Sequence, residues 1–172
     1  MLNMYLSQML GTIALVILIC SIQSNKKGTI LVLQIFCNLL FGLQYLLLNT
    51  ISGATMNFIA IIRGIIYYHY AKLNKKAPNW VLITLFIAIV FSSLLTSTGI
   101  ISILPILATL LYTYGIWQDN LKKYRVIIVI SAVGWLLYNF SVGAYVSTIS
   151  SILELVSGFI AIYRYDIKKK KQ

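Results

Sequence analysis

Two charged residues stand inside long apolar stretches of the sequence and are the first candidates for chemistry. Arg63 lies in the stretch 54–70, and Glu154 lies in the stretch 145–163. Charged side chains are costly in lipid, so they usually face a cavity, a partner helix or each other. At about 1.5 Å per helical residue, both lie roughly 15 Å from the turns before their stretches, near the middle of a bilayer. We expect Arg63 and Glu154 to form an ion pair, directly or through water, as a substrate or gating site or as a structural salt bridge.

Amide side chains extend this polar set. Asn57 falls on the same side of its stretch as Arg63, and Asn38 recurs with Gln34 and Tyr45 at three- and four-residue spacing. Amides hydrogen-bond solute hydroxyls or ring nitrogens, and in membrane bundles they also join helices to one another. Asn38 and Asn57 are therefore equally consistent with solute binding and with helix packing.

Small hydroxyl residues surround the acidic candidate. Ser147, Ser150 and Ser151 fall on one side of a helix together with Glu154, at about 100° per residue. Such a stripe predicts a cavity or a partner helix on this side rather than lipid.

The composition is that of an integral membrane protein. The 172 residues are 60% hydrophobic and 10% charged, with a mean hydropathy of +0.90. Soluble domains carry about 25% charged residues, so this chain lacks the polar residues to cover a globular surface. Because each span takes about 20 residues, seven spans with short connections leave no room in 172 residues for a soluble catalytic domain.

Enzyme and metal signatures are absent from the sequence. His69 stands beside tyrosines, and Cys20 and Cys37 lie in apolar stretches without metal-site spacing. No nucleophile-elbow, zincin or P-loop motif occurs. We therefore expect no enzyme activity, no cofactor and no metal.

The basic residues predict how the chain crosses the membrane. Every Lys and Arg except Arg63 falls after the first, third, fifth or seventh apolar stretch. Because Lys and Arg are retained in the cytoplasm, the N-terminus is predicted outside and the C-terminus inside. The net charge of +11 is thus a topology signal, and no nucleic-acid partner is expected. The seven stretches are 4–22, 29–48, 54–70, 80–97, 100–117, 126–140 and 145–163.

The sequence also contains an imperfect internal repeat. Residues 46–55 align with residues 136–145 at half of their positions, which pairs Asn49 with Asn139 ahead of two short turns. For these asparagines a capping or interfacial role is favoured. The fold predicted from the repeat is all-α, with seven transmembrane helices in a 3+1+3 arrangement. Its parts are a three-helix bundle in 1–73, a connector helix in 74–98, and a second, parallel three-helix bundle with a basic tail in 99–172.

This arrangement resembles the PQ-loop superfamily, which includes the SWEET sugar facilitators and the PnuC vitamin-precursor transporters. Within it, the opening Leu-Gly-Thr-Ile (10–13) and the segment Trp-Leu-Leu-Tyr-Asn (135–139) are most similar to the bacterial inner-membrane YgjV-type proteins. The resemblance to the sugar facilitators implies that Asn57 and Trp135 line a pocket. The first bundle departs from the pattern because it has no Pro-Gln pair, and Pro105 is the one proline within an apolar stretch.

The resulting hypothesis is a transporter or facilitator in the bacterial inner membrane. Its two bundles would move a small polar solute (sugar-, nucleoside- or vitamin-like) by alternating access around a midplane site of Asn38, Asn57, Arg63, Trp135 and Glu154. The alternative is a non-transporting regulatory, immunity or assembly protein whose buried polar groups are structural. The expected partners are the lipid bilayer and the solute, and a homo-oligomer is left open.

Overall fold

Helices joined by short connections make up the described part of the chain, which contains no strand. The computed structural model describes residues 2–23, 27–97, 99–118 and 120–167. Seven of its helices are long and apolar enough to cross a membrane. The elements are α1 (Leu2–Gln23), α2 (Lys27–Leu47), α3 (Ile51–Lys72), α4 (Asn79–Thr96), η1 (Ile100–Ser102), α5 (Ile103–Trp117), α6 (Leu121–Ser141), α7 (Tyr145–Ile162) and η2 (Tyr163–Ile167).

The seven predicted spans are confirmed as helices, and the largest difference is in α6. Its apolar stretch begins at Val126, whereas the helix begins at Leu121. The added residues include Lys122, Lys123 and Arg125, which are charged but still helical. Hydropathy therefore locates the membrane-spanning part of a helix rather than its end.

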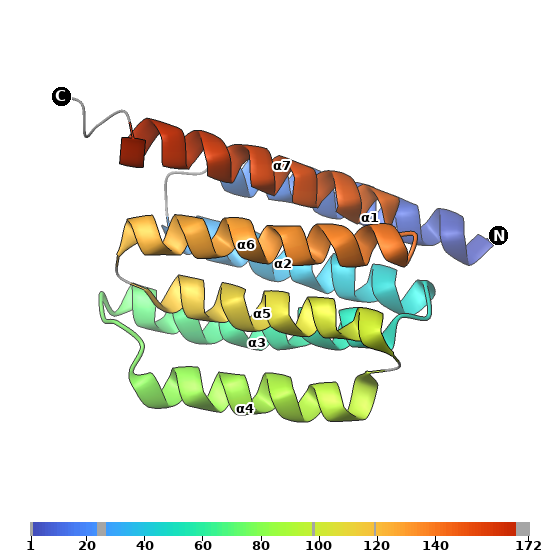
Figure 1. The fold of residues 1–172 in the computed structure, drawn as a ribbon, viewed down its shortest axis with the longest axis horizontal. Coiled ribbons are helices and arrows are strands. Elements are labelled where there is room, and N and C mark those ends of the chain that lie inside the picture. The colour runs from blue at the N-terminus through green and yellow to red at the C-terminus, as the bar shows by residue number, and fades with distance from the viewer. Residues whose placement is uncertain (1, 24–26, 98, 119, 168–172) are drawn as a thin grey trace.

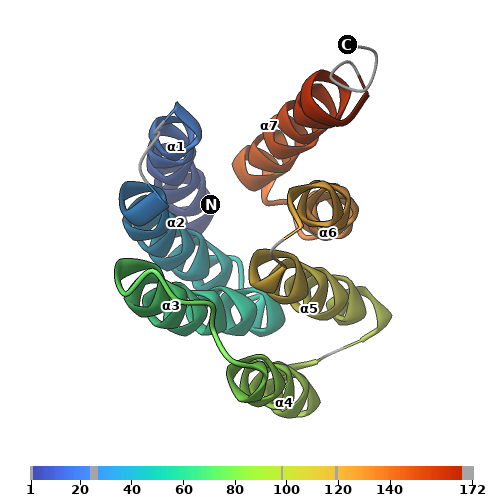
Figure 2. The same cartoon turned by 90° about the vertical axis from the view of Figure 1, so that its left-hand side faces the viewer.

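The helices lie nearly side by side in two rows. In the end-on view of Figure 2, α1, α2 and α3 form one row and α7, α6 and α5 face them. Sequence neighbours within each row contact one another, and α1–α7 and α3–α5 contacts join the rows. The N-terminus and the α2–α3, α4–α5 and α6–α7 connections share one end of the molecule, here called the N-terminal end (Figure 1). The opposite end is called the C-terminal end.

The helix α4 lies outside both rows. It contacts α3 and α5, and its buried side chains are Val81, Leu85, Ile89 and Ser93. Its connection to α3 is fastened to the end of α5, because the Trp117 indole donates to the Ala77 carbonyl at 3.0 Å.

Two turns at the N-terminal end have the same backbone geometry. Asn49 and Gly143 both adopt positive φ angles, of 56° and 72°. Thr50 N–H donates to the Tyr45 carbonyl, and Ala144 N–H donates to the Asn139 carbonyl. Each turn is thus a Schellman motif, in which a left-handed residue ends the helix.

The equivalence of these two turns differs from the register that the sequence predicted for a repeat. The sequence alignment pairs Asn49 with Asn139, but Asn49 lies after the end of α2, whereas Asn139 lies within α6. By backbone conformation, Asn49 corresponds to Gly143, and Tyr45 corresponds to Asn139. Asparagine and glycine both tolerate the left-handed conformation, which explains why residue identity misled the alignment.

The proline expected inside a helix lies at its start. Pro105 is the third residue of α5, in the first turn, where backbone N–H groups have no partner within the helix. Proline is tolerated there without breaking or kinking the helix.

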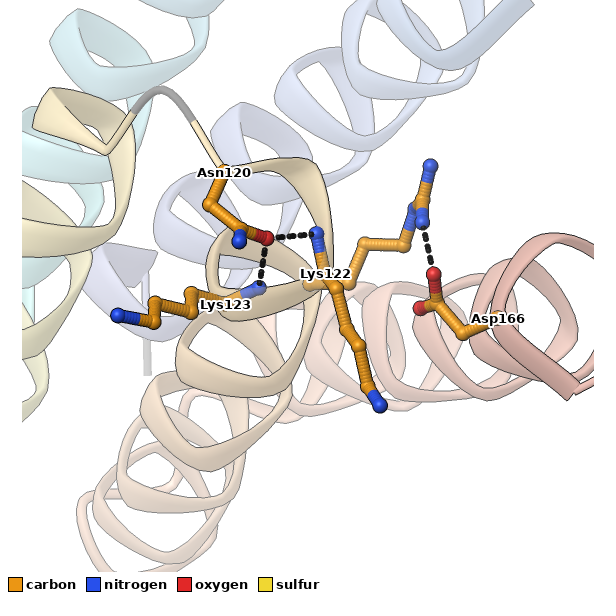
Figure 3. Close-up of polar contacts among 5 residues, drawn as sticks. Asn120, Lys122, Lys123 and Asp166 are labelled. Atoms are coloured by element: carbon orange, nitrogen blue, oxygen red, sulfur yellow. Dashed lines mark hydrogen bonds and ion pairs between the residues drawn. The ribbon is translucent and has the colours of Figure 1, made fainter.

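The C-terminal end contains a well-defined helix cap. The Asn120 side chain accepts hydrogen bonds from the backbone N–H groups of Lys122 and Lys123, at 3.0 and 3.2 Å (Figure 3). One turn later, Arg125 forms a 2.7 Å ion pair with Asp166 and so joins α6 to η2. The basic residues Lys26 and Lys168–Lys171 lie outside the described residues.

We predict that Asn120→Ala lowers the free energy of unfolding by about 1 kcal/mol, because two backbone donors lose their acceptor. Asn120→Asp should retain the stability, since aspartate caps equally well. Asn79→Ala is the matched control because Asn79 is exposed at the start of α4, whose cap makes no side-chain hydrogen bond. Thermal unfolding in detergent measures all three, and equal stability of the two alanine variants would contradict the cap.

Candidate functional site

A cavity of about 90 Å³ lies between the two rows of helices. Side chains from α1, α2, α3, α5, α6 and α7 line it, so every helix except α4 contributes. All five residues predicted for the site are brought together here. The lining consists of Leu18, Gln34, Cys37, Asn38, Phe41, Tyr45, Asn57, Ala60, Arg63, Thr109, Tyr112, Trp135, Asn139, Ser147, Ser150, Ser151 and Glu154.

Arg63 is held at the α5 side of the cavity. The residue is 6% exposed. Its guanidinium donates to the Thr113 hydroxyl at 3.0 Å and lies 4.6 Å from the centre of the Tyr112 ring. The Thr113 hydroxyl in turn donates to the Thr109 carbonyl at 2.7 Å. The hydroxyl of Tyr112 accepts from Gln34 on α2. A hydrogen bond and a cation–π contact therefore fix the position of the charge.

The direct ion pair expected between Arg63 and Glu154 is wrong. Both side chains line the cavity, but in the described part of the chain Glu154 forms neither an ion pair nor a hydrogen bond with any residue. The reason is that Arg63 turns toward Thr113 and Tyr112 on α5. A contact through water stays a prediction.

The two amide candidates bond to their own helices. The Asn38 side chain donates from Nδ2 to the Gln34 carbonyl at 2.8 Å, and the Asn57 side chain donates to the Gly53 carbonyl at 2.9 Å. Neither Oδ1 atom accepts a hydrogen bond from the described residues. Each asparagine therefore keeps an acceptor available at the cavity.

Aromatic rings close the cavity toward the N-terminal end. Tyr45, Trp135 and Tyr138 pack together, with ring centres 5.8–6.1 Å apart. The Tyr45 hydroxyl donates to Asn139 Oδ1, and Asn139 Nδ2 donates to the Ser147 carbonyl and the Ser151 hydroxyl, at 3.1 and 3.0 Å. We call Tyr45, Trp135, Tyr138 and Asn139 the N-terminal seal.

Two further hydrogen bonds cross between the rows beside this seal. The Ser147 hydroxyl on α7 donates to Gln44 Oε1 on α2 at 2.6 Å. Gly53 N–H on α3 donates to the Tyr138 hydroxyl on α6 at 3.0 Å. In the register of the two turns, Gln44 corresponds to Tyr138 and Gly53 corresponds to Ser147. Each bond therefore joins the same pair of equivalent positions. In one bond the α1–α3 row supplies the first position of the pair, and in the other the α5–α7 row supplies it.

The sequence interpretation located some of these groups and missed others. The serine stripe of α7 lines the cavity as expected. Asn139, expected to cap or lie at the interface, is 3% exposed and binds Tyr45. Thr109, Tyr112 and Thr113 were missed, although two threonines four residues apart in an apolar helix signal a polar face.

The cavity offers no constellation for metal binding. Among the residues that the structure describes, no group of three or more His, Cys, Asp or Glu side chains is placed to hold a metal ion.

Comparison with protein families gives a match over almost the whole chain. A model of the Imp-YgjV family, described as bacterial inner membrane protein, matches residues 5–169. The chain belongs to this family. It is therefore a multi-pass protein of the bacterial inner membrane, as its seven spans require. A search among curated proteins gave no match, and a search among solved structures gave none.

We predict that Gly53→Ala destabilises this Imp-YgjV protein by about 1–3 kcal/mol through overpacking. A methyl group at Gly53 would lie 2.7 Å from the Tyr138 hydroxyl and 3.0 Å from the Tyr45 ring. Gly99→Ala is the control, because no atom lies within 4 Å of a methyl group there. A lower melting temperature for Gly53→Ala alone is expected, and equal melting temperatures would contradict the close contact.

Proposed function

We propose that the protein moves a small polar solute across the inner membrane by alternating access. The observation that carries this proposal is the polar cavity, which contains two opposite charges and is shared by both rows of helices. Transporter sites lie near the bilayer midplane at the interface between structural repeats. A cavity with ionisable groups at this depth is a functional site by default.

The moving parts would be two three-helix units, α1–α3 and α5–α7, with α4 as the connector. Contacts within each unit and the position of α4 beside α3 and α5 support this division. The paired cross-links Gln44–Ser147 and Gly53–Tyr138 support a parallel repeat, because they relate the units by an approximate two-fold exchange. Kinship with the PQ-loop superfamily, which the sequence resembles, is part of the same proposal.

The proposed orientation has the N-terminal end outside the cell. The helix bounds put two groups of basic residues at the C-terminal end: Lys75 and Lys76 in the α3–α4 connection, and Lys122, Lys123 and Arg125 in the first turns of α6. Retention of Lys and Arg in the cytoplasm then makes that end the inner one. In this orientation the N-terminal seal closes the cavity on the outer side, and the conformation described is closed to the outside.

We predict that the protein lets a solute cross the membrane, and that a larger side chain in the cavity stops this flux. Liposomes containing the purified protein are loaded with small neutral, anionic, cationic or zwitterionic solutes, and their osmotic volume change is followed by light scattering. At least one solute should cross faster than in empty liposomes. Ala60→Phe should abolish this difference, because Ala60 lines the cavity and its surroundings are buried.

The matched control for this experiment is Ile62→Phe. Ile62 lies two residues away on α3 and is 55% exposed on the lipid-facing surface, so the same aromatic ring should leave the flux unchanged. Folding of both variants is checked by their melting temperatures. Absence of flux for every solute class, or equal flux with Ala60→Phe, would contradict transport and favour a non-transporting membrane protein.

We predict the orientation to be readable from cysteine labelling. In a variant with Cys20 and Cys37 replaced by alanine, Ser141→Cys should react with a membrane-impermeant maleimide in intact spheroplasts. Lys75→Cys should react only after permeabilisation, because it lies at the other end of the molecule, and both positions are exposed. The opposite labelling pattern would overturn the proposed orientation.

A further inference from the structure

Two opposite charges border the cavity without contacting each other. Arg63 belongs to α3 and Glu154 to α7, which stand in the two facing rows of Figure 2. Since no ion pair joins them in the described part of the chain, their charges do not cancel locally. Both charges are therefore available to a ligand between the rows.

On the α3 side, the cavity offers an anion site. A guanidinium has five N–H donors, and Arg63 uses one of its groups on Thr113 within the described residues. The remaining donors form a planar array that matches a carboxylate. Thr113 and Tyr112 hold this array in place before a ligand arrives, so little side-chain entropy is lost on binding.

The cavity also offers acceptors for a cation, a carboxylate on α7 and two amide oxygens on α2 and α3. The carboxylate of Glu154 on α7 has no hydrogen-bond or ion-pair partner among the described residues. Oδ1 of Asn38 on α2 and Oδ1 of Asn57 on α3 line the same cavity and also accept no hydrogen bond from those residues. An ammonium group carries three donors and no acceptor, so it suits a carboxylate with amide oxygens nearby.

The size of the cavity limits the ligand. Its volume of about 90 Å³ is smaller than the cavity of about 150 Å³ that holds one benzene molecule in an engineered protein. This space fits a solute with few non-hydrogen atoms better than a sugar or a nucleoside.

From these observations we propose that the solute is a small zwitterion of the α-amino-acid type. Its carboxylate binds Arg63 and its ammonium group binds Glu154. A solute with one charge would pair with only one of these two side chains and leave the other buried without a partner. A neutral solute would leave both side chains without one. The zwitterion satisfies both charges and adds no net charge to the middle of the membrane. This inference rests on the proposed function for transport, whereas binding itself is measured separately.

Four probes of the same size test the charge pattern. Alanine carries both charges, lactate only the carboxylate, alaninamide only the ammonium group, and lactamide neither. Their binding to the full-length protein in a non-ionic detergent is measured by titration calorimetry and by the shift in melting temperature. Alanine should bind at least about tenfold more tightly than each of the other three, which corresponds to about 1.4 kcal/mol.

Two variants test which residue recognises which charged group of alanine. Glu154→Gln should reduce the preference for alanine over lactate to about twofold or less, because the ammonium group loses its counter-charge. Arg63→Gln should do the same for the preference over alaninamide. The control is Ser157→Ala, on α7 but not in the cavity lining, which should keep both preferences. If Arg63→Gln fails to fold, Glu154→Gln decides, since Glu154 has no hydrogen bond or ion pair to lose among the residues that the structure describes.

Several results would overturn this inference. Binding of lactamide as tight as that of alanine would show a site for neutral solutes, and tighter binding of lactate or alaninamide would show a site for one charge. No binding of alanine, glycine or β-alanine would also overturn it. If liposome flux of another solute class persists in these cases, the transport proposal survives, and if no solute moves, both proposals fail.

Discussion

The hydrogen bond from the Tyr45 hydroxyl to Asn139 is the contact on which the arrangement of the two rows depends. Inside a bilayer, a side-chain hydroxyl or amide without a partner is costly, because no water replaces the missing bond. Tyr45 and Asn139 are 2% and 3% exposed, so no solvent reaches the Tyr45 hydroxyl or Asn139 Oδ1 to replace their bond. Their bond joins α2 to α6. The Trp135 ring stacks on Tyr45, and Tyr138 meets Trp135 edge-on beside it. The cavity begins where this packed region ends.

Some hydrogen-bonding atoms of the cavity are already bonded within the protein, and the remaining atoms are those that a ligand could contact. The Asn57 amide group donates to the Gly53 carbonyl, and the Arg63 guanidinium donates to the Thr113 hydroxyl. These internal bonds hold each side chain in one orientation, and they leave Oδ1 of Asn57 and the remaining donors of Arg63 available at the cavity. Selectivity would then follow from fixed groups, since a rigid site discriminates between charge patterns better than an adaptable one.

The sequence was sufficient for the number of helices, for their approximate bounds and for the five residues that meet at the cavity. Those features follow from apolar length and from the high cost of placing a polar group in lipid. Helical periodicity gives the side of α3 on which Arg63 lies, but not which neighbouring helix stands there. The nearest partner is Thr113 on α5 rather than Glu154 on α7, and only the packing of α3 against α5 reveals it. The register predicted for the repeat was wrong for a similar reason. Identity paired Asn49 with Asn139, whereas backbone conformation pairs it with Gly143.

The placement of Arg63 has a consequence for how the chain is built into the membrane during synthesis. Its partners Tyr112 and Thr113 are translated some fifty residues later, so α3 leaves the ribosome with a charge that nothing yet accommodates. An arginine at the centre of an isolated helix costs about 2.5–3.5 kcal/mol on insertion. The helix α3 therefore enters lipid less readily by itself than with α5 beside it. The apolar helix α4 is translated between them and contacts both in the folded protein.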